Sequence, residues 1–139
     1  MKSYKDKGII IKIKQFKESD KLVIILGEEY GRIEAVAKGA GKLLSKKTGS
    51  IDLLNLASFS FHKTKGIDLL LEAELLDDYS DIKSSLGSIS EIFYLLEIID
   101  KFMLGEGGDN EFYQDLTWFL QMFRSGVLER DILFSGLEL

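Results

Sequence analysis

The sequence predicts a five-stranded β-barrel followed by a small helical subdomain, and three observations support this fold class. Short segments rich in β-branched residues alternate apolar and polar side chains through the first half of the chain, with glycine-containing turns between them. After Leu76 the apolar spacing becomes helical. The length of 139 residues suits one barrel with a helical partner. We therefore expect a barrel over residues 1–78 and a helical subdomain over 79–139.

The five strands are assigned from the alternation of apolar residues. Residues 8–14 place Ile9, Ile11 and Ile13 on one face, and residues 22–26 are apolar on both faces. Such a series fits a Greek-key barrel, although an SH3-like barrel would give nearly the same pattern. The other expected strands, with their inward residues, are 32–38 (Ile33, Ala35, Ala37), 51–63 (Ala57, Phe59, Phe61) and 67–75 (Ile67, Leu69, Leu71, Ala73, Leu75).

Helix signals follow the last strand. Ser80 is expected to cap a short helix that ends at Gly87. Ser88 and Glu91 have the spacing of a capping box at the start of a second helix. Asn110 or the preceding aspartate can cap a third helix, which Gly126 ends. The apolar faces of these two helices are Ile92, Phe93, Leu96, Ile99 and Met103, then Phe112, Leu116, Phe119, Leu120 and Phe123.

Composition points to a cytoplasmic protein. The chain has no cysteine, so disulfides and thiolate zinc sites are excluded and a reducing compartment is favoured. The apolar runs are far shorter than the roughly 20 residues that span a bilayer. The first seven residues include four charged side chains and lack the apolar stretch of a signal peptide. We expect neither a membrane nor a small-molecule substrate as a partner.

The net charge of −5 hides a strong asymmetry between the two halves of the chain. Residues 1–65 carry 14 Lys and Arg against 7 Asp and Glu, a net charge of +7. Residues 66–139 carry 4 Lys and Arg against 16 Asp and Glu, a net charge of −12. The basic half is therefore the candidate for a surface that binds a polyanion.

Candidate contacts with a nucleic acid gather around the expected loops of the barrel. Four lysines lie among three glycines in residues 38–49, where the backbone can approach a phosphate closely. Other cations flank two further loops, and Tyr30 and Phe16 stand in turns where an aromatic ring can stack on a base. The predicted DNA-binding residues are Arg32, Lys38, Lys42, Lys46, Lys47, Lys63, Lys65, Lys17, Lys21 and Tyr30. The loop between the first two strands, flanked by Lys17 and Lys21, and the loop between the last two, flanked by Lys63 and Lys65, form the usual ligand face of such barrels together with the second and third strands.

Several segments, in order, resemble the RecO family. Residues 31–42 (GRIEAVAKGAGK), followed by Ser45, are similar to that family's glycine-led strand and its basic loop. Residues 6–10 with 18–22 resemble its first hairpin. Residues 71–75 (LEAEL) resemble its last barrel strand, and 92–98 (IFYLLEI) its first long helix.

The resemblance implies a function in recombinational DNA repair. It implies an OB-fold barrel that binds single- and double-stranded DNA, anneals strands and promotes recombinase loading, with RecR and single-strand-binding protein as partners. Family members are longer, so the helical subdomain is truncated relative to them, and many hold zinc with four cysteines that this chain lacks. Gly41 stands where the family favours an arginine, which removes one expected phosphate contact.

Two other classes of function stay open at this stage. A protein-interaction module that docks a repair partner is suggested by Leu133, Phe134, Leu137 and Leu139, which no later segment covers. A nuclease using Glu72 and Glu74 has weaker support, since an acidic outer face or salt bridges explain the same pair. The only histidine, His62, has no catalytic neighbours in the sequence, and the spacing of a nucleotide-binding P-loop is absent. We expect no enzyme activity, no cofactor and no metal.

Overall fold

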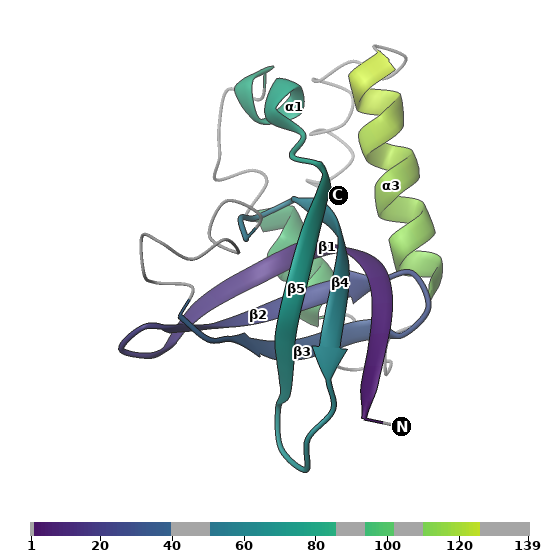
Figure 1. Cartoon of the computed structure of the whole chain (residues 1–139). Coiled ribbons are helices and arrows are strands. Elements are labelled where there is room, and N and C mark those ends of the chain that lie inside the picture. The colour runs from purple at the N-terminus through teal and green to yellow at the C-terminus, as the bar shows by residue number, and fades with distance from the viewer. Residues whose placement is uncertain (1, 40–50, 86–93, 102–109, 126–139) are drawn as a thin grey trace.

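A computed structural model describes residues 2–39, 51–85, 94–101 and 110–125 of the chain (Figure 1). The strands precede the helices, as the sequence predicts. The elements are β1 (Ser3–Lys17), β2 (Asp20–Gly27), β3 (Gly31–Ala37), β4 (Leu56–His62), β5 (Asp68–Asp77), α1 (Ser80–Ser85), a helical segment over 94–101 and α3 (Asn110–Ser125).

The strands form a closed barrel in the order β1-β2-β3-β5-β4. Neighbouring strands are antiparallel except β3 and β5, which run parallel where Ala35 and Val36 lie opposite Asp68 and Leu69. The predicted five-stranded OB-fold barrel followed by helices is therefore confirmed. The β3–β5 pairing joins residues more than thirty positions apart, which is why strand patterns alone could not separate this topology from an SH3-like one.

The barrel interior holds one hydrophobic core. Phe59 and Phe61 of β4 are fully buried there, so they belong to the core rather than to a base-stacking surface. Burial of each such ring contributes roughly 1.5–3 kcal/mol. The predicted inward residues of the third and fourth strands are confirmed. The other buried members are Ile10, Val23, Ile25, Ile33, Ala35, Ala37, Ala57 and Leu70.

A second core lies between the outside of the barrel and the helices. Ile24 and Leu26 of β2 face outward into it, while their neighbours in β2 face the interior. This explains why residues 22–26 are apolar on both faces. Figure 1 shows α3 standing beside the barrel, near the end of β2, and α3 contacts both β2 and β3. The buried residues that meet Ile24 and Leu26 are Ile9, Ile11, Leu54, Tyr79, Ile82, Leu96, Tyr113, Leu116 and Leu120.

β1 does not alternate evenly. Its pairing with β2 shifts register between Ile10 and Lys12, so Ile11 is an extra residue in the ladder. Ile9 and Ile11 therefore face the helices, whereas Ile10 and Ile13 pack toward the barrel interior. The prediction that Ile9, Ile11 and Ile13 share one face was wrong, because a β-bulge reverses the side on which the following residues lie.

The fourth and fifth strands also differ from expectation. β4 begins at Leu56 rather than at residue 51, and Leu54 just before it is buried with a φ of 72°. In β5 a register shift leaves Leu71 exposed while Leu70 points inward opposite Phe61. Of the predicted inward residues of this strand, only Ala73 packs in the interior core. The bulge again changes the side that each residue faces.

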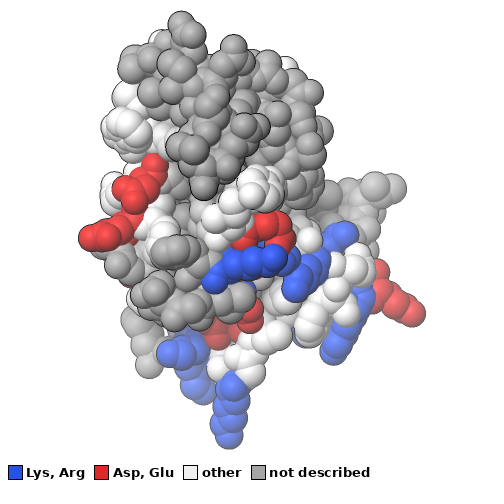
Figure 2. Space-filling model, turned by 180° about the vertical axis from the view of Figure 1, so that it is seen from behind, with Lys and Arg blue, Asp and Glu red and all other residues white. Residues whose placement is uncertain are grey.

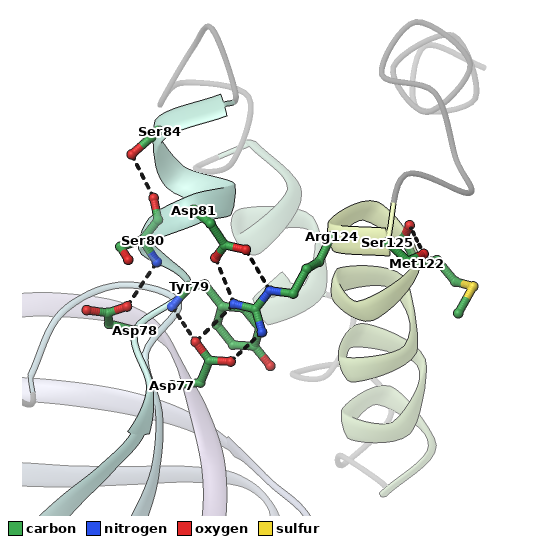
Figure 3. A network of polar contacts seen from close by, with 9 residues as sticks. All are labelled: Asp77, Asp78, Tyr79, Ser80, Asp81, Ser84, Met122, Arg124 and Ser125. Atoms are coloured by element: carbon green, nitrogen blue, oxygen red, sulfur yellow. Dashed lines mark hydrogen bonds and ion pairs between the residues drawn. The ribbon is translucent and has the colours of Figure 1, made fainter.

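The start of α1 is held by aspartates (Figure 3). Ser80 was predicted to cap this helix, but it is the first helical residue. The first helical hydrogen bond runs from Lys83 N to Tyr79 O, at 2.9 Å, so Tyr79 occupies the cap position with a φ of 49°. Asp78 accepts a hydrogen bond from the Ser80 N–H at 3.0 Å. The side-chain acceptor of this helix start is thus a carboxylate rather than the Ser80 hydroxyl.

The predicted apolar face of α3 is confirmed. Leu116 and Leu120 are buried, and Phe112, Phe119 and Phe123 pack against the same core. The predicted signals at Gly87, Ser88, Glu91 and Gly126 lie outside the described residues. Among the helices that the structure describes, none has the length and apolar character needed to cross a membrane.

Candidate nucleic-acid interface

Three predicted contact residues meet where the turn between β1 and β2 lies beside the end of β3. The register places Lys17 opposite Asp20, and Lys21 opposite Ala37, the residue before Lys38. Asp20 Oδ1 accepts a hydrogen bond from the Gly39 N–H at 3.0 Å, which ties the turn to the chain leaving β3. Lys17, Lys21 and Lys38, here called the turn lysines, are therefore held at one end of the barrel.

The turn lysines have no acidic partner in the described part of the chain. The ion pairs found there use Lys12, Arg32, Lys83 and Arg124 instead. Lys17 and Lys38 are exposed, and Lys21 is half-buried. Glu18 and Asp20 lie in the same turn, but neither forms an ion pair with these lysines in the described part of the chain. Cations gathered at one place attract a polyanion and release its counterions when they contact its phosphates.

Lys14 and Phe16 add to this end of the barrel. Lys14 is exposed and pairs with Leu22, close to the turn, and sequence reasoning did not select it. The sequence feature that could have identified Lys14 is its position on the more polar face of the alternating residues 8–14. Phe16 is 42% exposed, and Lys17 Nζ lies 5.6 Å from the centre of its ring. An exposed aromatic ring among cations can stack on a base while the cations bind the backbone.

Lys63, Lys65 and Tyr30 lie elsewhere. The β2–β3 ladder runs from Lys21 opposite Ala37 to Gly27 opposite Gly31, so Tyr30 and the turn lysines stand at opposite ends of that hairpin. Lys63 and Lys65 belong to the loop between β4 and β5, and both are exposed. The predicted site therefore divides into two groups. Figure 2 shows Lys and Arg side chains in several places on the lower half of the face that it draws, with Asp and Glu side chains among them.

Lys42, Lys46 and Lys47 lie outside the described residues, as do the four apolar residues that suggested partner docking. DNA binding by these three lysines and partner docking by the four apolar residues stay predictions.

Arg32 is engaged in an ion-pair network. Its Nε lies 2.8 Å from Asp100 Oδ1 in the 94–101 helix, and its Nη1 lies 2.9 Å from Glu34 Oε1. The Asp100 side chain is only 4% exposed, and Lys12 Nζ lies 3.6 Å from its other oxygen. Burial acts to lower the pKa of Arg32, but the hydrogen bonds to Asp100 and Glu34 outweigh it and raise the pKa. A phosphate would have to displace a buried carboxylate to reach Arg32.

The helices cover part of the face that the sequence suggested for ligand binding. Lys12 Nζ lies 3.0 Å from Glu97 Oε1, so cations on the outside of β1 and β3 are both paired with the 94–101 helix. The hydrogen bond to Glu97 raises the pKa of Lys12. Ile24 and Leu26, on β2 between these strands, pack against the helices. The expectation that the outside of the second and third strands is open to a ligand thus needs correction, because acidic helix residues occupy it.

The residues considered for catalysis lie on the strands β4 and β5. Glu74 and Glu72 of β5 pair with Ser58 and Ser60 of β4. Across residues 2–39, 51–85, 94–101 and 110–125, no three His, Cys, Asp or Glu side chains are grouped so that they could hold a metal ion. His62, half-buried at the end of β4, pairs with Ser3.

The chain is similar in sequence to proteins of a known family. The family model for the recombination protein O N terminal matches residues 1–79, which include all five strands. The chain belongs to this family. The RecO resemblance seen in the sequence is therefore confirmed.

Curated RecO relatives extend the match into the helical part. The DNA repair protein RecO of Clostridium novyi is 28% identical over 98% of this chain and 53% of its own length. That of Gloeothece citriformis is 35% identical over 86% of this chain and 42% of its own length. The DNA repair protein RecO of Desulforamulus reducens is 31% identical over 99% of this chain and 57% of its own length. The chain thus spans about half the length of the curated relatives it matches.

Proposed function

We propose that this chain is a DNA-binding part of a recombinational repair protein, and that the turn lysines bind the sugar–phosphate backbone. The observation that carries the proposal is the meeting of Lys17, Lys21 and Lys38 at one end of the barrel without acidic partners among the described residues. Family membership supports the role in repair, because the matched relatives are DNA repair proteins. Lys14 and Phe16 lie beside these lysines and extend the same surface.

Within this proposal, the other predicted contact residues have different roles. Tyr30, at the far end of the β2–β3 hairpin, forms a second contact together with Lys63 and Lys65 of the β4–β5 loop. Arg32 positions the helix through Asp100 rather than contacting phosphate. Strand annealing, recombinase loading and cooperation with RecR and single-strand-binding protein belong to the proposal through the family alone.

A salt-dependent titration tests the proposal. We expect the protein to bind a fluorescein-labelled oligothymidine of about 20 nucleotides, with an affinity that falls as salt rises by a slope near −0.7 per phosphate contacted. Changing all three turn lysines to glutamate is expected to abolish binding at moderate salt and to reduce the slope. Fluorescence anisotropy at several salt concentrations gives both quantities.

The matched control is Lys101→Glu, which reverses an exposed lysine on the 94–101 helix. The affinity of Lys101→Glu for the oligothymidine should stay within about twofold of that of the unaltered protein, because Lys101 lies outside the proposed surface. Binding that does not depend on salt, or an equal loss in the control and in single glutamate variants of the turn lysines, would contradict the proposal.

A further inference from the structure

Three aromatic rings lead from the barrel interior to its surface. Phe61 is fully buried, and the Tyr4 ring stacks on it with centroids 4.8 Å apart and an interplanar angle of 23°. The Tyr30 ring lies on Tyr4, also at 4.8 Å, with an angle of 50°. Tyr30 remains 55% exposed. The outermost ring is therefore supported from below and open to solvent.

The backbone that carries Tyr30 is fixed as well. Asp6 is only 6% exposed, and its carboxylate accepts hydrogen bonds from the N–H groups of Glu29 and Tyr30, the latter at 3.0 Å. The Tyr4 hydroxyl donates to Asp68 Oδ2 at 2.5 Å. Burial, with this bond to Asp68, raises the pKa of Tyr4, so its hydroxyl stays protonated as a donor. An aromatic ring held in this way loses little conformational entropy when a ligand binds it.

Cations flank the rings on one side. Tyr4 pairs with Phe61, and two residues further along these strands the Lys63 N–H donates to the Lys2 carbonyl at 2.6 Å. Both lysines are exposed, as is Lys65 in the same loop. Asp68, which binds the Tyr4 hydroxyl, also accepts a hydrogen bond from the Thr64 N–H at 3.4 Å and so connects this loop to the rings.

Two acidic residues lie beside Tyr30 in the chain. Glu28 and Glu29 belong to the same turn as Tyr30 and would repel a phosphate. A nucleotide at this place would therefore stack its base on Tyr30 and direct its phosphates toward the lysines of the β4–β5 loop.

We propose that Tyr30, supported by Tyr4, is a stacking site for an unpaired nucleobase. This inference rests on the proposed DNA-binding function and adds selectivity to it. Lysine–phosphate contacts form with single strands and duplexes alike, whereas a base inside a duplex is covered on both faces by its neighbours. The turn lysines thus bind either form of DNA, and Tyr30 favours single-stranded DNA.

Two substitutions at Tyr30 test the inference in the complete chain. Tyr30→Ala should weaken binding to an oligothymidine of about 20 nucleotides by roughly 5- to 100-fold, the range measured for loss of one stacked base. Binding to a duplex of equal length should change by less than about twofold, and the salt slope should stay the same because no phosphate contact is lost. Tyr30→Phe keeps the ring and should bind as the unaltered protein does.

Tyr94→Ala is the matched control, since Tyr94 is 58% exposed on the 94–101 helix and should not affect DNA binding. A thermal melt of each variant checks that folding is retained. Unchanged single-strand affinity in Tyr30→Ala, or an equal loss for both forms of DNA, would overturn the inference while leaving the proposed function intact. If the unaltered protein binds no DNA, the proposed function and this inference fail together.

Discussion

The guanidinium of Arg124 binds both carboxylate oxygens of Asp77, with Nη1–Oδ2 and Nη2–Oδ1 distances of 2.6 and 3.0 Å (Figure 3). Its Nε and Nη2 also donate to Asp81 at 2.7 Å, and the guanidinium carbon lies 4.8 Å from the centre of the Tyr79 ring. Asp77 ends β5, Asp81 lies in α1 and Arg124 lies near the end of α3. A single side chain therefore joins α3 to the point where the barrel strand passes into α1.

Replacing this arginine should loosen the helical part. We expect Arg124→Gln to lower the free energy of unfolding by about 1 kcal/mol, because the bidentate pair with the partly buried Asp77 is lost. Urea unfolding followed by circular dichroism measures the change. Arg124→Lys should recover only part of it, since an ammonium group cannot bind two carboxylates in the same planar geometry. Equal stability of the Gln variant and the unaltered protein would contradict the assigned role.

The same contact predicts how stability depends on pH. The hydrogen bond to Arg124 lowers the pKa of Asp77 from its ordinary value of 3.8 in the folded protein. The contribution of Asp77 to stability is therefore complete above about pH 4 and is lost as the pH falls through the lower folded-state pKa. Unfolding free energies measured from pH 5 downward should fall less steeply in Arg124→Gln. A parallel decline in both proteins would exclude this carboxylate as the cause.

The Arg32–Asp100 pair should behave as a buried ion pair. Among the described residues, Arg32→Gln leaves Asp100 with the more distant Lys12 as its one cationic partner, so we expect a loss of about 3 kcal/mol in stability. In a double-mutant cycle with Asp100→Asn, the double variant should lose less than the two single losses together. Glu34→Gln is the control, because Glu34 is the exposed partner and should cost under about 0.5 kcal/mol. Additive losses would show that the pair is not coupled.

Gly27 is required by the close approach of Asp6. A Cβ at Gly27 would lie 2.2 Å from Asp6 Oδ2, the oxygen that accepts the Tyr30 N–H. We expect Gly27→Ala to displace this carboxylate and to lower stability by roughly 2 kcal/mol or more. Gly66→Ala, where a Cβ would have no neighbour within 4 Å, should be nearly neutral. Thermal melts of the two variants provide the comparison, and similar melting temperatures would argue against it.

The spacing of apolar residues predicted the buried side of a strand or helix correctly wherever that spacing is regular. The residue sets of β3 and β4 and the apolar face of α3 follow directly from periods of two and 3.6 residues. They failed at Ile13 and Leu71, where a bulge adds a residue on one strand only. A bulge is a property of the pairing between two strands, so the pattern of one strand does not reveal it.

The sequence predicted the candidate site only as a list of cations and one aromatic residue, Tyr30, without their arrangement in space. Sequence reasoning selected the turn lysines from loops that seemed separate, and the β2–β3 register brings them together. It also selected Arg32, although the Arg32 guanidinium is already paired with the carboxylate of Asp100. Arg32 and Asp100 are 68 residues apart, and no local pattern connects an isolated aspartate to a particular arginine.

The sequence by itself determined that this chain forms a small barrel followed by helices, and that its cations are concentrated in the barrel half. The spacing of apolar residues and the net charge of a segment depend only on residues that are close in sequence, so both can be determined without knowing how the chain folds. Only the tertiary structure decided which cations are free. Asp100 and Glu97 reach Arg32 and Lys12 across the outside of the sheet, whereas the register leaves the turn lysines without an acidic partner in the described residues. Charge acts over a few ångströms in space, and those distances are set by strand pairing and helix docking.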